Sequence, residues 1–169
     1  MYKRQGITLI SFSNDHLVAQ EGVYVFGFLP SQQITRIVNF ALESGYRNLA
    51  AFVPENHFGK LAIETSKKAV LVQGKDLSRA QYYQPDGGNL TELVKSFADY
   101  QIRRENLTIQ RRQLLRQKDE IAASLLSKLQ GMDTFGNPPF DSVLLPAGGS
   151  DLKRIAPLCL LYTSPSPRD

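Results

Sequence analysis

Two short polar segments carry the side chains best suited to bind a small polar ligand. Ser13 and Asn14 follow an apolar run and offer a hydroxyl and an amide. Gly149, Ser150 and Asp151 stand at an expected helix start, where free backbone N–H groups can bind carboxylate or phosphate. Each segment also has a structural explanation. The first suits an Asx-type turn, and the second a tight turn with Ser150 as N-cap and Asp151 favourably placed against the helix dipole.

Three aromatic residues add candidates for a ligand site. Phe58 either covers a ligand or anchors the first turn of a helix in the core. Tyr82 and Tyr83 end a predicted strand, so one faces the core and the other faces a ligand site or solvent. We count Tyr83 among the candidate ligand-binding residues, and the sequence leaves open which of the two faces the site.

The sequence contains no enzyme signature, so we expect no catalytic residue. Ser150 lacks the G-x-S-x-G pattern of a nucleophilic serine, and Lys153 belongs to no phosphate-binding loop. His57 has no acidic partner at a readable spacing. One cysteine and two histidines cannot form a Cys/His zinc site, and we expect neither a metal nor a cofactor.

The composition predicts one domain with a sizeable core. The chain has 169 residues, of which 42% are hydrophobic and 21% charged, which excludes collagen-like, disulfide-framework and wholly disordered proteins. No apolar run reaches the roughly 18 residues that a membrane span needs. Residues 101–128 hold seven basic and three acidic residues, which accounts for the net charge of +4. A basic face for nucleic acid is therefore not expected, although a weaker alternative is a nucleic-acid-binding piece that uses this segment.

Strand and helix patterns alternate along the chain. Apolar runs predict strands over 7–12, 23–28, 48–53, 76–83 and 141–145. Helices are predicted from Pro30 to Gly45, from Asn56 to Gly74, after Asn89, and after Ser150. This order predicts an α/β protein with an open, doubly wound parallel sheet, whose ligands bind beyond the carboxyl ends of the strands.

The helical pattern over residues 89–130 is too long for one crossover helix. At 1.5 Å per residue it would extend about 60 Å, so we expect a break near residues 100–106, with the second part projecting. Leu107, Leu114 and Ile121 recur every seven residues, but Arg111 and Lys118 occupy the second seam of a coiled coil. The segment is either a solvated helix or a docking arm for an anionic partner or membrane surface.

Both ends differ from the middle of the chain. Residues 1–5 and 159–169 resemble translated adapter sequence, and natural flexible termini are the alternative. We leave both segments out of the fold prediction.

Four motifs resemble the leucine-binding-protein branch of the type I periplasmic binding proteins. They are the segments 10–14, 22–27, 54–59 and 140–149. Within that branch the sequence is most similar to the penicillin-binding-protein activators. The resemblance implies that residues 6–30 form the end of a first lobe and the crossover. It implies that residues 31–158 form the first half of a second lobe, with an insertion at about 101–130.

The resemblance also implies site residues, partners and a location. Ser13 stands where the family binds a ligand carboxylate, and Phe58 where an aromatic residue covers the ligand. Asp151 lies near the family's acid for a ligand ammonium, although the local sequence departs from the family pattern. The implied function is a non-enzymatic module that binds a penicillin-binding protein, with a solute-binding component of an ABC transporter as the alternative. Its implied location is the periplasm, near the membrane through a lipid anchor preceding these residues.

Overall fold

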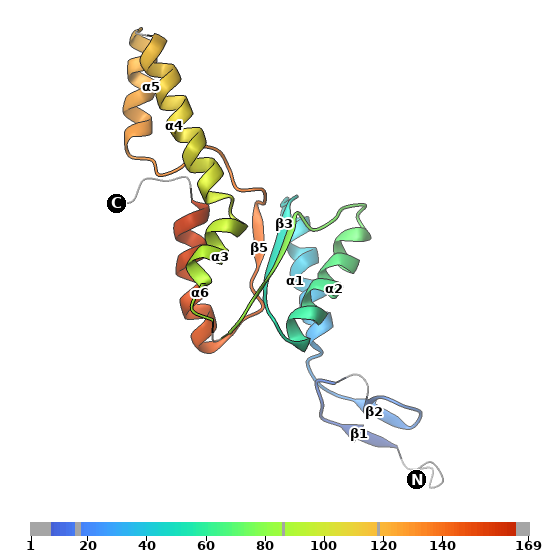
Figure 1. The fold of residues 1–169 in the computed structure, drawn as a ribbon. Coiled ribbons are helices and arrows are strands. Elements are labelled where there is room, and N and C mark those ends of the chain that lie inside the picture. The colour runs from blue at the N-terminus through green and yellow to red at the C-terminus, as the bar shows by residue number, and fades with distance from the viewer. Residues whose placement is uncertain (1–7, 16–17, 86, 118, 165–169) are drawn as a thin grey trace.

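The computed structural model describes residues 8–15, 18–85, 87–117 and 119–164. Figure 1 shows a sheet with helices on both faces, a small two-stranded unit and a projecting pair of helices. The strands are β1 (Leu9–Ser11), β2 (Val23–Val25), β3 (Leu49–Pro54), β4 (Arg79–Tyr83) and β5 (Ser142–Leu144). The helices are α1 (Pro30–Glu43), α2 (His57–Leu71), α3 (Leu90–Phe97), α4 (Tyr100–Gln117), α5 (Glu120–Gln130) and α6 (Gly149–Thr163).

The central sheet is parallel, with strand order β4-β3-β5. All six residues of its middle strand β3 are buried, as expected where helices cover both faces of a parallel sheet. Alternate β3 residues enter two different cores, because successive side chains point to opposite faces. Leu49, Ala51 and Val53 pack with α1 and α2, whereas Ala50 and Phe52 pack with α3 and α6. The predicted α/β class with parallel strands is confirmed, but the strands form two small sheets, β1-β2 and β4-β3-β5, rather than one open sheet.

The first crossover helix, α1, follows the signals in its sequence. Pro30 occupies the first helical turn, where backbone N–H groups have no acceptor within the helix. The lack of an N–H in proline therefore costs no helical hydrogen bond at this position. Gly45, with a φ of 95°, follows the helix in the left-handed conformation that favours glycine. Ile37 lies on the solvent side of α1 and is exposed. The buried stripe consists of Ile34, Val38 and Leu42.

The outer strands are shorter than predicted. β4 begins at Arg79 rather than near Asp76. The Asp76 carboxylate instead accepts a hydrogen bond from the N–H of the next residue, Leu77 (2.7 Å). β5 keeps only the middle of the predicted segment 141–145.

The chain before α1 forms a separate two-stranded unit. β1 and β2 pair in parallel, so the two predicted strands are confirmed in three residues each. A Cβ at Gly27 would overlap the carbonyl oxygen of Ser13, so the two segments that leave these strands lie backbone to backbone. Glycine is required at this close approach.

The predicted helical segment 89–130 is three helices, and the first break lies at Ala98–Asp99, directly before the predicted range 100–106. α3 ends before Asp99, whose φ of 50° turns the chain, and α4 then runs unbroken through residues 100–106. A second interruption precedes α5, where the Asp119 carboxylate accepts a hydrogen bond from the Ala122 N–H (2.6 Å). α4 and α5 lie side by side and stand away from the sheet (Figure 1). The projection is confirmed, but the projecting element is a helical hairpin.

The last helix starts earlier than predicted. Its N-cap is Gly148, without a side-chain hydrogen bond, and Ser150 already lies in the first turn, so the assignment of Ser150 as N-cap is wrong. α6 continues to Thr163 and buries Cys159. No helix in the described part of the chain is both long and apolar enough to cross a membrane.

Candidate functional site

A cavity of about 500 Å³ lies where β3 and β4 end and α6 begins. Its position agrees with the rule that places ligands at the carboxyl ends of parallel strands. It contains Phe58, Tyr83 and Asp151 from the sequence-predicted site. The other lining residues are Pro54, Asn56, Pro85, Pro146, Ala147 and Gly148.

Tyr83 is the most buried of the candidate side chains that line this cavity. It is 1% exposed, and its ring stacks on Phe52 with centroids 5.3 Å apart and an interplanar angle of 12°. Tyr82, its neighbour, is partly exposed. Successive side chains of β4 point to opposite faces of the sheet, so Tyr83 rather than Tyr82 packs in the core. Tyr83 also lines the cavity.

The Tyr83 hydroxyl is buried and makes no hydrogen bond of standard geometry with any described residue. Burial raises the pKa of this phenol, and the charge and hydrogen-bonding proximity of Asp151 raise it further. The Asp151 carboxylate therefore lies near the hydroxyl, without the alignment of a strong bond. A ligand group that both donates and accepts hydrogen bonds, such as a hydroxyl, would satisfy both side chains, because the carboxylate only accepts and the phenol can donate.

Phe58 is placed at the rim by the start of α2. Asn56 caps this helix as predicted, its Oδ1 accepting a hydrogen bond from the Gly59 N–H (2.9 Å). A Cβ at Gly59 would overlap the Pro54 carbonyl oxygen, so glycine allows the helix to begin against the end of β3. Phe58 is 39% exposed, which places its ring at the cavity rather than fully in the core.

The glycine-rich turn contributes less than predicted. Gly148 and Asp151 line the cavity, whereas Gly149 and Ser150 are not among the lining residues. Gly149 has a φ of 57°, so a left-handed turn carries the chain into α6.

Ser13 and Asn14 lie on the segment after β1 and do not line the cavity. The Ser13 hydroxyl accepts a hydrogen bond from the Asp15 N–H (3.0 Å). This is a local turn closed by a serine hydroxyl, where an Asx-type turn was predicted.

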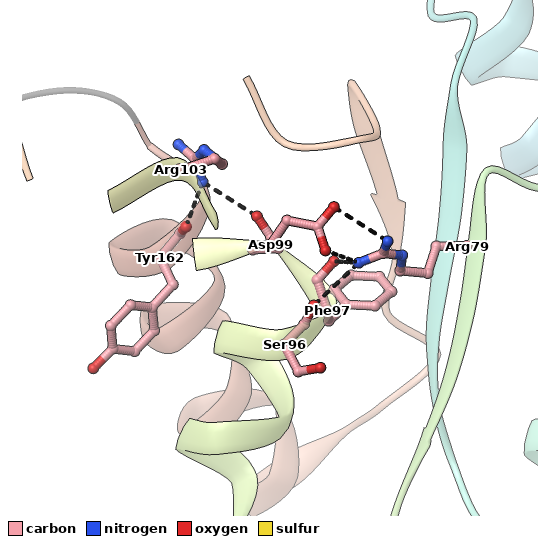
Figure 2. Close-up of polar contacts among 7 residues, drawn as sticks. Arg79, Ser96, Phe97, Asp99, Arg103 and Tyr162 are labelled. Carbon is pink, nitrogen blue, oxygen red and sulfur yellow. Dashed lines mark hydrogen bonds and ion pairs between the residues drawn. The ribbon is translucent and has the colours of Figure 1, made fainter. Parts of the chain in front are cut away.

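Arg103 holds the base of the α4–α5 hairpin. This residue is 3% exposed, and no described carboxylate forms an ion pair with it. Its guanidinium donates hydrogen bonds to Gly136 O (2.9 Å), Tyr162 O (2.9 Å) and Thr134 Oγ1 (3.0 Å), with longer bonds to Ala98 O and Thr163 O. Burial lowers the pKa of Arg103, and the Asp99 charge opposes that change. Figure 2 shows Arg103 directed at the carbonyl end of α6.

A second arginine fixes the break between α3 and α4. The Arg79 guanidinium meets both carboxylate oxygens of Asp99, at 2.7 and 3.2 Å, and also donates to the carbonyls of Ser96 and Phe97 (Figure 2). These carbonyls belong to the last turn of α3, so Arg79 caps that helix from the sheet. Sequence reasoning missed Arg79, Asp99 and Arg103, since all three contacts depend on tertiary structure.

The basic surplus of the hairpin is partly engaged inside the protein. Arg111 donates to the carbonyls of Leu129, Gln130 and Met132 and so caps α5. With Arg103 also buried, two of the seven basic residues of segment 101–128 face carbonyls rather than a partner. The predicted attraction for an anionic surface is correspondingly weaker.

The cavity is lined by side chains that can bind a polar ligand. Asp151 supplies a negative charge, Tyr83 a hydroxyl and Phe58 an aromatic edge. In the described ranges no three His, Cys, Asp or Glu side chains gather in a way that could hold a metal ion. A cation or a hydroxyl-bearing molecule matches these groups better than an anion does.

No protein-family model matches this chain, and no solved structure matches it significantly. The chain is similar to "Uncharacterized protein RP748" of Rickettsia prowazekii (strain Madrid E), at 21% identity over 97 residues. The alignment covers 57% of this chain and 26% of the relative, so the matched part spans about a quarter of that protein. The relative's name states no activity.

Proposed function

We propose that this chain is a non-enzymatic, periplasmic-binding-protein-like module that regulates cell-wall synthesis by contacting a penicillin-binding protein. The proposal includes the periplasm as its location. The part of the proposal that likens the chain to periplasmic binding proteins rests on the four sequence motifs. The observation that carries the partner-binding role is the α4–α5 hairpin, which stands away from the sheet and is firmly attached at its base (Figure 1).

The hairpin has the properties of a preformed docking element. Arg103 and the Arg79–Asp99 pair connect its base to α6 and β4, so little ordering entropy is lost when a partner binds. Ile121 and Leu125 lie one turn apart on α5 and are both exposed. Exposed aliphatic side chains at this spacing suit an apolar groove on a partner.

The test measures binding of the full chain to a purified penicillin-binding protein by biolayer interferometry. Ile121→Asp and Leu125→Asp should each weaken binding by about tenfold or more, because each places a charge in an apolar contact. The matched control is Ile37→Asp, which puts the same charge at an exposed isoleucine of α1 and should change nothing. Equal binding by all four proteins would contradict the proposal.

A second candidate is the binding of a small polar solute, and the cavity between Phe58, Tyr83 and Asp151 favours it. A thermal-shift screen with amines, amino acids and small carboxylates tests this candidate. Stabilisation by several degrees with one compound, lost in Asp151→Asn, would favour the solute-binding component over the regulator.

A further inference from the structure

The outward face of α4 carries a regular row of side chains that nothing in the structure covers. α4 packs on α5 and the base of the hairpin through Tyr100, Arg103 and Leu107, which are buried. The opposite row repeats with spacings of three and four residues, so its members share one face of the helix. The row consists of Ile102, Glu105, Ile109, Arg112 and Arg116, all exposed.

The charges of this row are separated along the helix. Glu105 precedes Ile109, and Arg112 and Arg116 follow it. None of these three charged side chains forms an ion pair within the described residues. The row is therefore negative before Ile109 and positive after it, and Ile102 precedes the negative residue.

This order complements itself when two copies run antiparallel. A two-fold axis between Thr108 and Ile109 places Glu105 of one copy level with Arg112 of the other, because each residue advances the same distance along the helix. The same axis places Ile109 beside Thr108, and Ile102 level with Leu115. A parallel arrangement would instead oppose Glu105 to Glu105 and Arg112 to Arg112, which repel.

We propose that the outward face of α4 binds the same face of a second copy of this chain, antiparallel, with Ile109 at the centre. The contact is isologous, as in most two-fold dimers. Ile109 supplies the apolar centre, and the two Glu105–Arg112 pairs set orientation and register more than affinity. One helix face buries little area, so we expect a weak dimer with a dissociation constant on the order of micromolar.

This inference goes beyond the proposed function and does not depend on it. The self-contact uses α4, whereas the proposed partner contact uses Ile121 and Leu125 of α5. The outcome of the dimerisation test is therefore independent of the outcome of the partner-binding test.

Sedimentation velocity of the full chain across a series of concentrations tests the proposal. Wild type should show a reversible monomer–dimer equilibrium, and Ile109→Asp should weaken the dimer by about tenfold or more. Ile121→Asp is the matched control, because it makes the same change on α5 and should leave the dimer intact. Circular dichroism of each variant checks that the helices are retained.

Charge exchange tests the orientation. Glu105→Arg and Arg112→Glu should each weaken the dimer, and the double variant should restore it, because the pair is re-formed with reversed polarity. A wild-type chain that stays monomeric throughout the series would overturn the proposal. So would a dimer that Ile109→Asp leaves unchanged, or a double variant no tighter than the single ones.

Discussion

Arg79 and Asp99 connect the first residue of β4 to the break between α3 and α4. The guanidinium lies 2.7 Å from one carboxylate oxygen and 3.2 Å from the other, and it also caps the last turn of α3. β4 ends at the opposite side of the sheet, where Tyr83 lines the cavity. One strand thus carries the attachment of the hairpin at its start and a binding-site residue at its end.

A double-mutant cycle measures the interaction free energy between Arg79 and Asp99. Arg79→Gln and Asp99→Asn should show a coupling energy of about 0.5–1 kcal/mol in urea unfolding, modest because both side chains are about one-third exposed. Arg79→Gln should be the more destabilising, since it also removes the donor to two α3 carbonyls. Additive effects would contradict a direct interaction.

The left-handed backbone conformation of Asp99 can be tested separately from its ion pair. Its φ of 50° is tolerated by Asp and Asn but costs other L-residues roughly 1–2 kcal/mol. Asp99→Ala should therefore be less stable than Asp99→Asn by about 1 kcal/mol, although both lack the carboxylate. Equal free energies of unfolding would show that this conformation is not under strain.

Arg103 should be among the most sensitive positions of the hairpin base. Arg103→Met should lower the free energy of unfolding by about 3 kcal/mol, because it leaves five buried or partly buried acceptors without this donor. Arg103→Lys should recover little of this loss, since one ammonium cannot match the planar fork. The exposed neighbour is the control: Arg104→Gln should change stability by less than about 0.5 kcal/mol. A similar small effect at Arg103 would contradict its assigned role.

Tyr83→Phe should leave the ligand-free protein as stable as before, or more stable by up to about 1 kcal/mol. The substitution removes a buried hydroxyl that lacks a well-aligned partner, and it keeps the ring stacked on Phe52. Urea unfolding of Tyr83→Phe, with Tyr82→Phe as the control, measures this difference. A clear loss of stability would show that the hydroxyl bonds strongly to Asp151.

The free energy of unfolding should depend on pH in the alkaline range because of the Cys159 thiol. Burial raises the pKa of its thiol from 9.0 to about 11, so the fold favours the protonated form. The stability from this difference is intact below pH 9 and is lost as the pH rises from 9 to about 11, because the unfolded chain ionises first.

Cys159→Ala lacks that titration, so its stability should decline less than that of wild type over the same pH range. The two proteins share every other titrating group, and the difference between their unfolding free energies isolates the thiol. Parallel declines would mean that the thiol ionises alike in both states.

The parallel sheet could be predicted from the sequence because its signals are local. Residues 48–53 form an unbroken apolar run, and Gly45 and Asn56 mark the adjoining helix boundaries. The cavity could be predicted in part, since Phe58, Tyr83 and Asp151 follow strand ends, where parallel strands share one edge.

The hairpin was harder to predict. Nothing in the sequence around Asp99 identifies a left-handed residue, and its conformation depends on Arg79, 20 positions away. Asp119 did carry a readable signal, because an N-cap aspartate followed by Glu120 is typical of a helix start. The burial of Arg103 depends on carbonyls of α6, which no local pattern reveals.

The most direct test of the account removes the hairpin without disturbing its base. Residues 112–128 are replaced by about four Gly/Ser residues, which keeps Arg103, Asp99, the buried Leu107 and Leu129, and the hydrogen bond from Arg111 to the Leu129 carbonyl. The shortened chain should fold but should no longer capture a purified penicillin-binding protein that the intact chain captures. This is the result that a partner-docking role of the hairpin predicts. Capture of that protein with unchanged affinity by the shortened chain would contradict it.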